Sequence, residues 1–318
     1  MNKNEQYWQK RQARQRVKNA DLTHNKIRRR TEKMYNDTLL RVEKELSDLY
    51  DQITDANHVP SANELYRYNR YYKTFEYVSN ELAKLHSKFF RTIDPDFEKL
   101  YRDTVENTIY AIEQDYFDSK AAKQVSDNLW KTSRKNWSKD VWCSDGLNAE
   151  IRHKKQMYKL QQALETGLVD CVARGKSKDQ LITEIEKRFG VERYEADRLV
   201  RTELTYLQNQ ATMDSYVEEG VKEYQFLATL DNRTSEHCLE ENGKHYPITD
   251  ARVGDNYPPC HPNCRCTTIP YLNRSVNRQL ELQGEFGRSE EFKPWAEEQA
   301  LKKKIIEDRA KVKTKKKP

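Results

Sequence analysis

Apolar side chains recur at steps of three and four residues along most of the first 220 positions. This spacing places them on one face of a helix and favours amphipathic α-helices over strands. One such stripe consists of Leu39, Val42, Leu46, Leu49 and Ile53. Too few heptads follow one another for a long coiled coil, so we interpret the stripe as one face of a helical bundle. Nine glycines and nine prolines in 318 residues also supply too few turns for an all-β fold.

Turn and cap residues divide this helical pattern into segments. A first helical region covers residues 3–56, and the residues at 58–61 predict its end. Ser61 begins a capping-box pattern, and Asp94-Pro95 predicts another helix start with proline in its first turn. Gly190 predicts a helix end. The later helices expected from these signals cover residues 148–172, 177–189 and 191–218.

The pattern changes from helical to extended after Gly220. Alternating apolar residues predict a strand near residues 224–230, and further strands are expected at 244–248 and 266–271. Pro270 cannot donate a ladder hydrogen bond, which predicts that the last strand lies at the edge of its sheet. We therefore expect an α+β chain. A long, mainly α-helical N-terminal region precedes a small α+β module of helices and a short antiparallel sheet.

The domain organisation follows from composition and turn chemistry. With 36% hydrophobic and 34% charged residues, one large globular core is not expected. Ser144-Asp145-Gly146 is typical of a turn between domains. We predict an elongated helical region at 1–145, the α+β module at 146–275, and a polar, basic tail at 276–318.

Charge is concentrated at the two ends of the chain. Residues 1–33 hold 11 Lys and Arg against 3 acids, and residues 301–318 hold 9 against 2. The remainder has 57 − 20 = 37 basic and 51 − 5 = 46 acidic residues, a net charge of −9. Basic ends indicate either contact with nucleic acid or solvated tails. The residues we select as DNA-contact candidates are Arg11, Arg14, Arg28, Arg29, Arg30, Lys302, Lys303, Lys304, Lys315, Lys316 and Lys317.

No apolar run approaches the 18 residues that a membrane span needs, so we expect a soluble, non-secreted chain. Trp130, Trp137 and Trp142 alternate with lysines and arginines. Such a pattern is compatible with stacking on bases. We favour the alternative, in which these side chains anchor helices to their neighbours.

Four of the six cysteines lie in two short segments, 231–238 and 260–266, together with two histidines. Two thiols, a nearby histidine and a ligand from a separate loop suit tetrahedral zinc. The predicted Zn ligands are Cys238, His261, Cys264 and Cys266, with Cys260, His237 and His245 as spare candidates. Reduced buried thiols or a disulfide involving Cys238 are the alternatives.

A hydrolytic site is a further alternative, since zinc with an open position activates water. Its candidate residues are Asp231, His237, Glu240, His245, Asp250 and Asp255. The chain has no H-E-x-x-H, P-loop or G-x-S-x-G motif. It also lacks a helix-turn-helix or basic zipper pattern typical of a regulatory DNA-binding protein. We therefore predict a protein without enzymatic activity.

Several short motifs occur in a fixed order over residues 165–271. They are Arg201-Thr202-Glu203 on a helix, Asp231-x-Arg233-Thr234-Ser235-x-x-Cys238, Gly243, and Pro259-x-His261-Pro262-x-Cys264-Arg265-Cys266. Together they resemble the phage Mu F-like family of minor head proteins, also called phage head morphogenesis proteins. Cys260 departs from the family pattern and adds a possible fifth ligand.

The resemblance implies a minor capsid protein of a tailed phage that is associated with the portal vertex. Its implied partners are the portal protein, a capsid or scaffolding protein, and double-stranded DNA bound without sequence preference. Its implied role is to assist head assembly and DNA delivery or ejection. The implied location is the virion, with host cytoplasm during assembly. A zinc-dependent nuclease or toxin-like hydrolase built on the same cluster is the alternative function.

Overall fold

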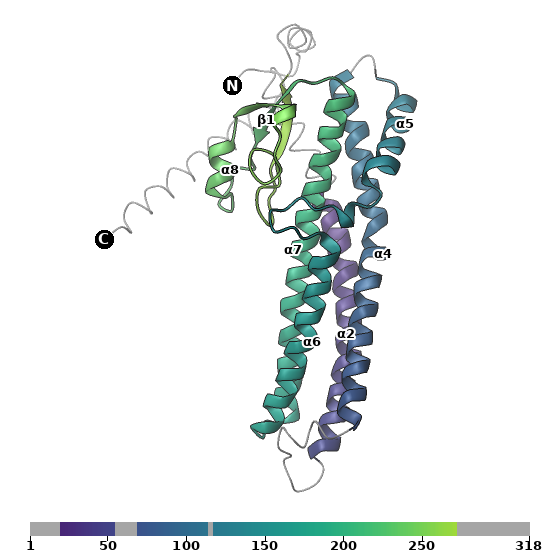
Figure 1. Ribbon diagram of the computed structural model, residues 1–318, viewed down its shortest axis with the longest axis vertical. Coiled ribbons are helices and arrows are strands. Elements are labelled where there is room, and N and C mark those ends of the chain that lie inside the picture. The colour runs from purple at the N-terminus through teal and green to yellow at the C-terminus, as the bar shows by residue number, and fades with distance from the viewer. Residues whose placement is uncertain (1–19, 55–68, 114–116, 272–318) are drawn as a thin grey trace, which may run out of the picture. The chain divides into compact units, whose positions relative to one another are not determined.

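The computed structural model describes residues 20–54, 69–113 and 117–271 (Figure 1). The main helices are α2 (Leu22–Thr54), α4 (Asn69–Glu113), α5 (Ser119–Leu129), α6 (Ala149–Ala173), α7 (Lys178–Glu218) and α8 (Glu236–Glu241). The strands are β1 (Glu223–Leu227), β2 (His245–Pro247) and β3 (Thr267–Tyr271). Short π- or 3₁₀-helical turns are η3 (Trp130–Arg134), η4 (Trp137–Lys139) and η5 (Ile248–Asp250). Long helices followed by a small sheet confirm the predicted α+β class.

The chain divides into two compact units. We call residues 24–97 and 136–201 the bundle unit, and the described parts of residues 1–23, 98–135 and 202–318 the sheet unit. Helices α4 and α7 contribute residues to both units. Each unit combines segments that are distant in the sequence, whereas each predicted domain is one continuous stretch. The predicted domain boundary at Ser144–Gly146 therefore stays a prediction.

The bundle unit consists of α2, α6 and the adjoining parts of α4 and α7, which run side by side in Figure 1. The predicted stripe on α2 faces the core, where Val42, Leu46 and Leu49 are fully buried. Burying each of these side chains contributes about 1.5 to 3 kcal/mol. Residues from the other three helices complete this core, among them Val78, Leu82, Phe89, Leu160, Leu164, Leu168, Leu181 and Ile185.

Two predicted helix boundaries are wrong. Pro95 lies inside α4, and α7 continues through Gly190. Pro95 is exposed, so water can reach the carbonyl that loses its helical hydrogen bond. The buried neighbours Ile93 and Phe97 keep the helix packed on both sides. Tertiary packing outweighs the local preference of a proline or glycine at these positions.

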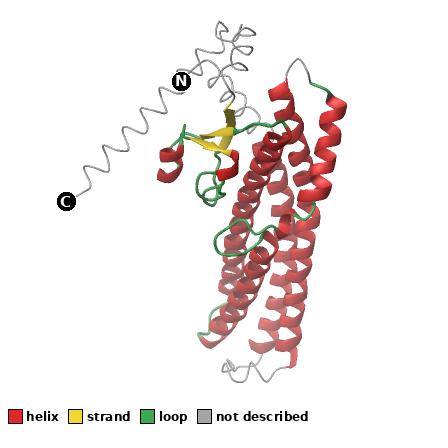
Figure 2. Cartoon of the chain, turned by 45° about the horizontal axis from the view of Figure 1, so that its top comes forward, coloured by secondary structure: helices red, strands yellow, loops and turns green. Residues whose placement is uncertain are grey.

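The sheet unit contains an antiparallel sheet with the order β2-β1-β3 (Figure 2). Strand β3 therefore lies at an edge, which confirms the prediction from Pro270. One core cluster is aromatic and comprises Tyr216, Tyr224 and Tyr257, with Val221. In another cluster Ile269 packs on Ala111 of α4.

Trp130 and Trp137 anchor helices, as expected. Trp137 stacks on Phe97 at a ring-centroid distance of 3.9 Å and donates a 3.0 Å hydrogen bond to Asp94 in the bundle unit. Trp130 is buried in the sheet unit beside Tyr101, with ring centroids 5.5 Å apart. Both indoles are thereby removed from a role in stacking on bases.

A polar network lies within the apolar bundle. His153 of α6 is fully buried and stacks on Phe89 at 4.1 Å. Its Nε2 lies 3.0 Å from the Tyr35 hydroxyl, and its Nδ1 lies 2.9 Å from Nδ1 of His86. Because the two Nδ1 atoms share one hydrogen bond, one of them carries a proton and the other accepts it. The network therefore suits neutral histidines.

This network predicts acid sensitivity. Burial, and then the neighbouring His86, lower the pKa of His153 to about 3, from 6.5 in an unperturbed side chain. Below about pH 6.5 the unfolded chain binds a proton that the folded bundle excludes. The free energy of unfolding should therefore fall as pH drops from about 6.5 to 3, with His153 contributing roughly 4 to 5 kcal/mol of the loss.

Urea unfolding followed by circular dichroism at several pH values measures this effect. Because carboxylates also titrate in acid, the comparison is with His153→Gln, whose stability should depend less steeply on pH. Parallel pH profiles for the two proteins would contradict the assignment.

Candidate metal centre

A capped turn presents Cys238 at the start of α8. The Ser235 hydroxyl accepts a 3.2 Å hydrogen bond from the Cys238 backbone N–H and caps the helix. Before it, the Asp231 carboxylate accepts the Arg233 N–H at 2.8 Å, and the Thr234 hydroxyl accepts the Asp231 N–H at 2.9 Å. The predicted motif at 231–238 is thus a turn and cap that bury the Cys238 thiol.

A second turn brings His261 back towards Cys264. The Cys264 N–H donates to the His261 carbonyl at 3.0 Å. Asn263 adopts a positive φ of 62°, a conformation that asparagine tolerates better than most residues. The segment therefore presents ligand-type side chains from both ends of one tight turn.

The part of α7 from Thr202 onwards holds this second segment by its backbone. The Thr202 hydroxyl accepts the Asn263 N–H at 3.0 Å, Thr205 donates to the Cys264 carbonyl at 2.8 Å, and Asn209 donates to the Cys266 carbonyl at 3.2 Å. Positions 202, 205 and 209 lie on one face of a helix. The Arg201-Thr202-Glu203 motif therefore includes a residue that docks the cysteine segment.

Sequence reasoning selected Thr202 and missed Thr205 and Asn209. The available signal was their spacing of three and seven residues from Thr202, which places all three polar side chains on one face of the helix. Tyr257 was also missed; it is buried, and its hydroxyl donates to the Asn209 carbonyl at 2.5 Å.

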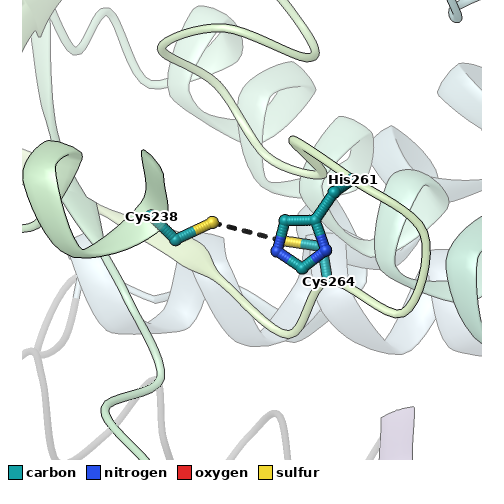
Figure 3. A group of neighbouring side chains, drawn as sticks. All are labelled: Cys238, His261 and Cys264. Atoms are coloured by element: carbon teal, nitrogen blue, oxygen red, sulfur yellow. Dashed lines mark hydrogen bonds between the residues drawn. The ribbon is translucent and has the colours of Figure 1, made fainter. Parts of the chain in front are cut away.

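Cys238, His261 and Cys264 converge, with their ligand atoms within 4.8 Å of one another (Figure 3). The two sulfurs are 4.0 Å apart. Two thiolates on one tetrahedral zinc are about 3.8 Å apart, given Zn–S bonds of about 2.3 Å. A disulfide would need about 2.05 Å, and all six cysteines are free thiols. The geometry suits a shared metal ion better than a disulfide.

Cys260 and Cys266 border the same group. Cys266 belongs to the buried cluster that contains Cys238 and Cys264, and Cys260 packs against that cluster. Cys266 is buried with them, whereas Cys260 is partly exposed, and its thiol donates to the Asp255 carbonyl at 3.4 Å. The group whose ligand atoms lie within 4.8 Å of one another includes neither Cys260 nor Cys266.

Hydrogen bonding within the cluster lowers the pKa of Cys238 and Cys264 and raises the pKa of Cys260 and Cys266. Hydrogen bonds from the neighbouring thiols, Cys238 first, lower the pKa of Cys264. The pKa of Cys238 falls to about 5, with the hydrogen bond to Cys260 as the main cause. Hydrogen bonds to Cys238 and Cys264 raise the pKa of His261 to about 10. His261 Nδ1 lies 2.9 Å from the Pro262 carbonyl, which leaves Nε2 as the nitrogen available to a metal.

Arg265 and Asp231 tie the two cysteine segments together. The guanidinium donates twice to the carboxylate, with Nη1–Oδ2 and Nη2–Oδ1 distances of 2.6 Å each. Burial opposes ionisation of Asp231, but hydrogen bonds from Arg265 and the Arg233 backbone lower its pKa to about 2. Both residues were selected from the sequence, and the structure makes them partners.

The residues proposed for hydrolysis do not form one group in the described part of the chain. His237 Nε2 lies 2.7 Å from the backbone carbonyl of Asp255. His245 packs its ring on Tyr271 at 4.1 Å. The Asp231 carboxylate is engaged by Arg265.

The DNA-contact candidates fall into two sets. Arg28 and Arg29 are exposed on α2, while Arg30 forms an ion pair with Asp96. The others, at positions 11, 14, 302–304 and 315–317, lie outside the described residues. No helix in the described ranges is long and apolar enough to cross a membrane.

The hydrogen bonds from α7 generate a prediction. Thr205→Val keeps the side-chain shape but leaves the buried Cys264 carbonyl without its hydroxyl donor. We expect a loss of about 1 to 3 kcal/mol in the free energy of unfolding of the sheet unit. Thr249→Val, on exposed η5, is the matched control and should change stability by no more than about 0.5 kcal/mol. Equal denaturation midpoints for both variants would contradict the docking role.

Comparisons with known proteins converge on the same part of the chain. A family model described as Phage Mu protein F like protein matches residues 162–269. An uncharacterized protein of Haemophilus influenzae is 24% identical over 112 residues, which cover 35% of this chain and 25% of that relative. No solved structure matches. The matched segment contains α7, β1, β2 and the cysteine cluster and ends within β3, and residues 162–269 are thus similar to the phage Mu protein F like family.

Proposed function

We propose that this chain is a minor head protein of a tailed phage that sits at the portal vertex and assists head assembly and DNA delivery. The observation that carries the proposal is the family match over residues 162–269. Within this range, the residues that define the resemblance form one connected structure. Thr202 docks the second cysteine segment, and Arg265 pairs with Asp231 of the first.

We further propose that the cysteine cluster holds a structural zinc ion. Cys238, His261 and Cys264 would be three ligands, and buried Cys266 would be the fourth, with Cys260 as the competing thiol. Bound zinc would cross-link α8 to the segment that leads into β3. A sheet of three short strands buries little apolar surface, which is where structural zinc contributes folding free energy.

A structural role follows from the proposed ligand set, because four protein ligands would fill a tetrahedral site. Catalytic zinc retains an open position for water. The nearby histidine His237 directs its Nε2 to the backbone carbonyl of Asp255. These features support a protein without enzymatic activity over a zinc-dependent nuclease or toxin-like hydrolase.

The proposed partners are the portal protein, a capsid or scaffolding protein, and double-stranded DNA. The basic ends of the chain, with net charges of +8 and +7 from the counts above, would contact DNA without sequence preference. The proposed location is the virion, after assembly in the host cytoplasm.

Metal analysis tests the zinc proposal. Purified full-length chain should contain one zinc per molecule, and Cys264→Ser should lose it. Cys143→Ser is the matched control, because Cys143 lies outside the cluster, and it should retain the metal. Cys266→Ser should weaken zinc binding more than Cys260→Ser if Cys266 is the fourth ligand. Metal-free protein with fully titratable thiols would refute the proposal.

Incorporation into particles tests the role in the head. In phage particles assembled with the altered chain, His261→Ala should reduce the amount of this protein per particle, since its module would be destabilised. His237→Ala should leave the amount unchanged. A chain that is absent from particles in its unaltered form would refute the head-protein assignment. Normal incorporation of both variants, with loss of a hydrolytic activity, would favour the enzyme alternative.

A further inference from the structure

Helices α2 and α4 run next to each other in the bundle unit (Figure 1). Ion pairs between them show that basic residues lie along the side where they meet. We call this row of residues the basic seam and define it by Lys26, Arg30, Lys33 and Arg41 of α2, and Lys84 and Lys88 of α4. The four α2 positions are separated by four, three and eight residues, so they share one face of the helix. At about 1.5 Å per residue, the row on α2 is about 22 Å long.

Ion pairs between the helices determine which residues meet along the seam. Towards one end, Lys26 lies 2.8 Å from Asp96, which also pairs with Arg30. Towards the other end, Arg41 and Lys84 lie 2.6 and 2.7 Å from Glu81. The two helices are therefore antiparallel, and this register places Lys33 and Lys88 within about one helical turn of each other.

Each acid within the seam is outnumbered by bases. The Asp96 and Glu81 side chains are only 7% and 6% exposed, and each pairs with two cations. The amines paired with them still face solvent, since the Lys26 and Lys84 side chains are 64% and 71% exposed. With Asp37 included, the seam has six basic and three acidic residues, a net charge of +3.

The middle of the seam holds Lys33 and Lys88 with Asp37, so it carries the same net charge of +1 as each end. Lys33 and Lys88 are both exposed, and neither forms an ion pair with a carboxylate among the described residues. The ion pairs at Asp96 and Glu81 are sufficient to hold α2 against α4. The two lysines between them are not needed for that contact. Two like charges at this separation repel, and an anion lying along the seam would relieve the repulsion.

We propose that the basic seam binds the phosphate backbone of double-stranded DNA. A duplex carries one negative charge per about 1.7 Å of its axis, so a length of about 22 Å presents about 13 charges. Contacts to phosphate are independent of sequence and release counterions. This inference rests on the proposed function, because packaged DNA is the polyanion that a head protein meets. It adds a surface on the folded bundle to the contacts proposed for the basic ends.

The test is DNA binding by the full chain at several salt concentrations. The double variant Lys33→Gln with Lys88→Gln should bind a random-sequence duplex more weakly. Each lost phosphate contact should reduce the slope of log affinity against log salt by about 0.9, giving a total reduction of up to about 1.8. The matched control is Lys155→Gln with Lys187→Gln, which removes two exposed lysines from α6 and α7. It should keep the original slope.

Equal slopes for the seam variant and the control would overturn the proposal and assign DNA binding to other basic residues. Polyglutamate that competes as well as duplex DNA at equal charge would also overturn it, by indicating an acidic protein as the occupant. The amount of each variant in assembled particles is measured in parallel. If the seam variant binds DNA as before and is incorporated normally into particles, the seam proposal is rejected and the head function is not. If the unaltered chain is absent from particles, the head function is rejected.

Discussion

The hydrogen bonds that α7 makes to the second cysteine segment determine the arrangement of the sheet unit. Residues 260–266 have no regular secondary structure, so their backbone groups need partners from elsewhere. Thr202, Thr205 and Asn209 provide those partners. Because β3 begins at Thr267, directly after this segment, the same contacts set where the edge strand meets β1. The thiols of Cys264 and Cys266 are buried as a consequence.

Buried or partly buried carboxylates with more than one donor recur in both units. In the bundle unit, Asp96 and Glu81 each pair with two cations. In the sheet unit, Asp214 accepts hydrogen bonds from Arg134 and Tyr101. Removing one partner of such a group leaves a buried charge poorly compensated, which is costly. These contacts therefore specify how neighbouring helices align, even where their net contribution to stability is small.

The sequence predicted elements best where one periodic signal extended over many residues. The α2 stripe, the helix at 149–173 and the strand at 223–227 lie close to their expected positions. Pro270 correctly indicated an edge strand, because a missing N–H has the same consequence in any sheet. Pro95 and Gly190 were misleading, since buried residues on both sides hold each helix together across them. A local preference of a few kcal/mol or less is outweighed by that packing.

By itself, the sequence determined the helical content, the small sheet and three residues that the structure brings together in the cysteine cluster, Cys238, His261 and Cys264. These follow from interactions between residues close together in the chain, such as helical periodicity and the turn that joins His261 to Cys264. Only the tertiary structure decided that Arg265 pairs with Asp231 and that Thr205 holds the Cys264 carbonyl. These partners are 34 and 59 residues apart. Local propensity carries no information about such pairs, because the folding of the intervening chain brings them together.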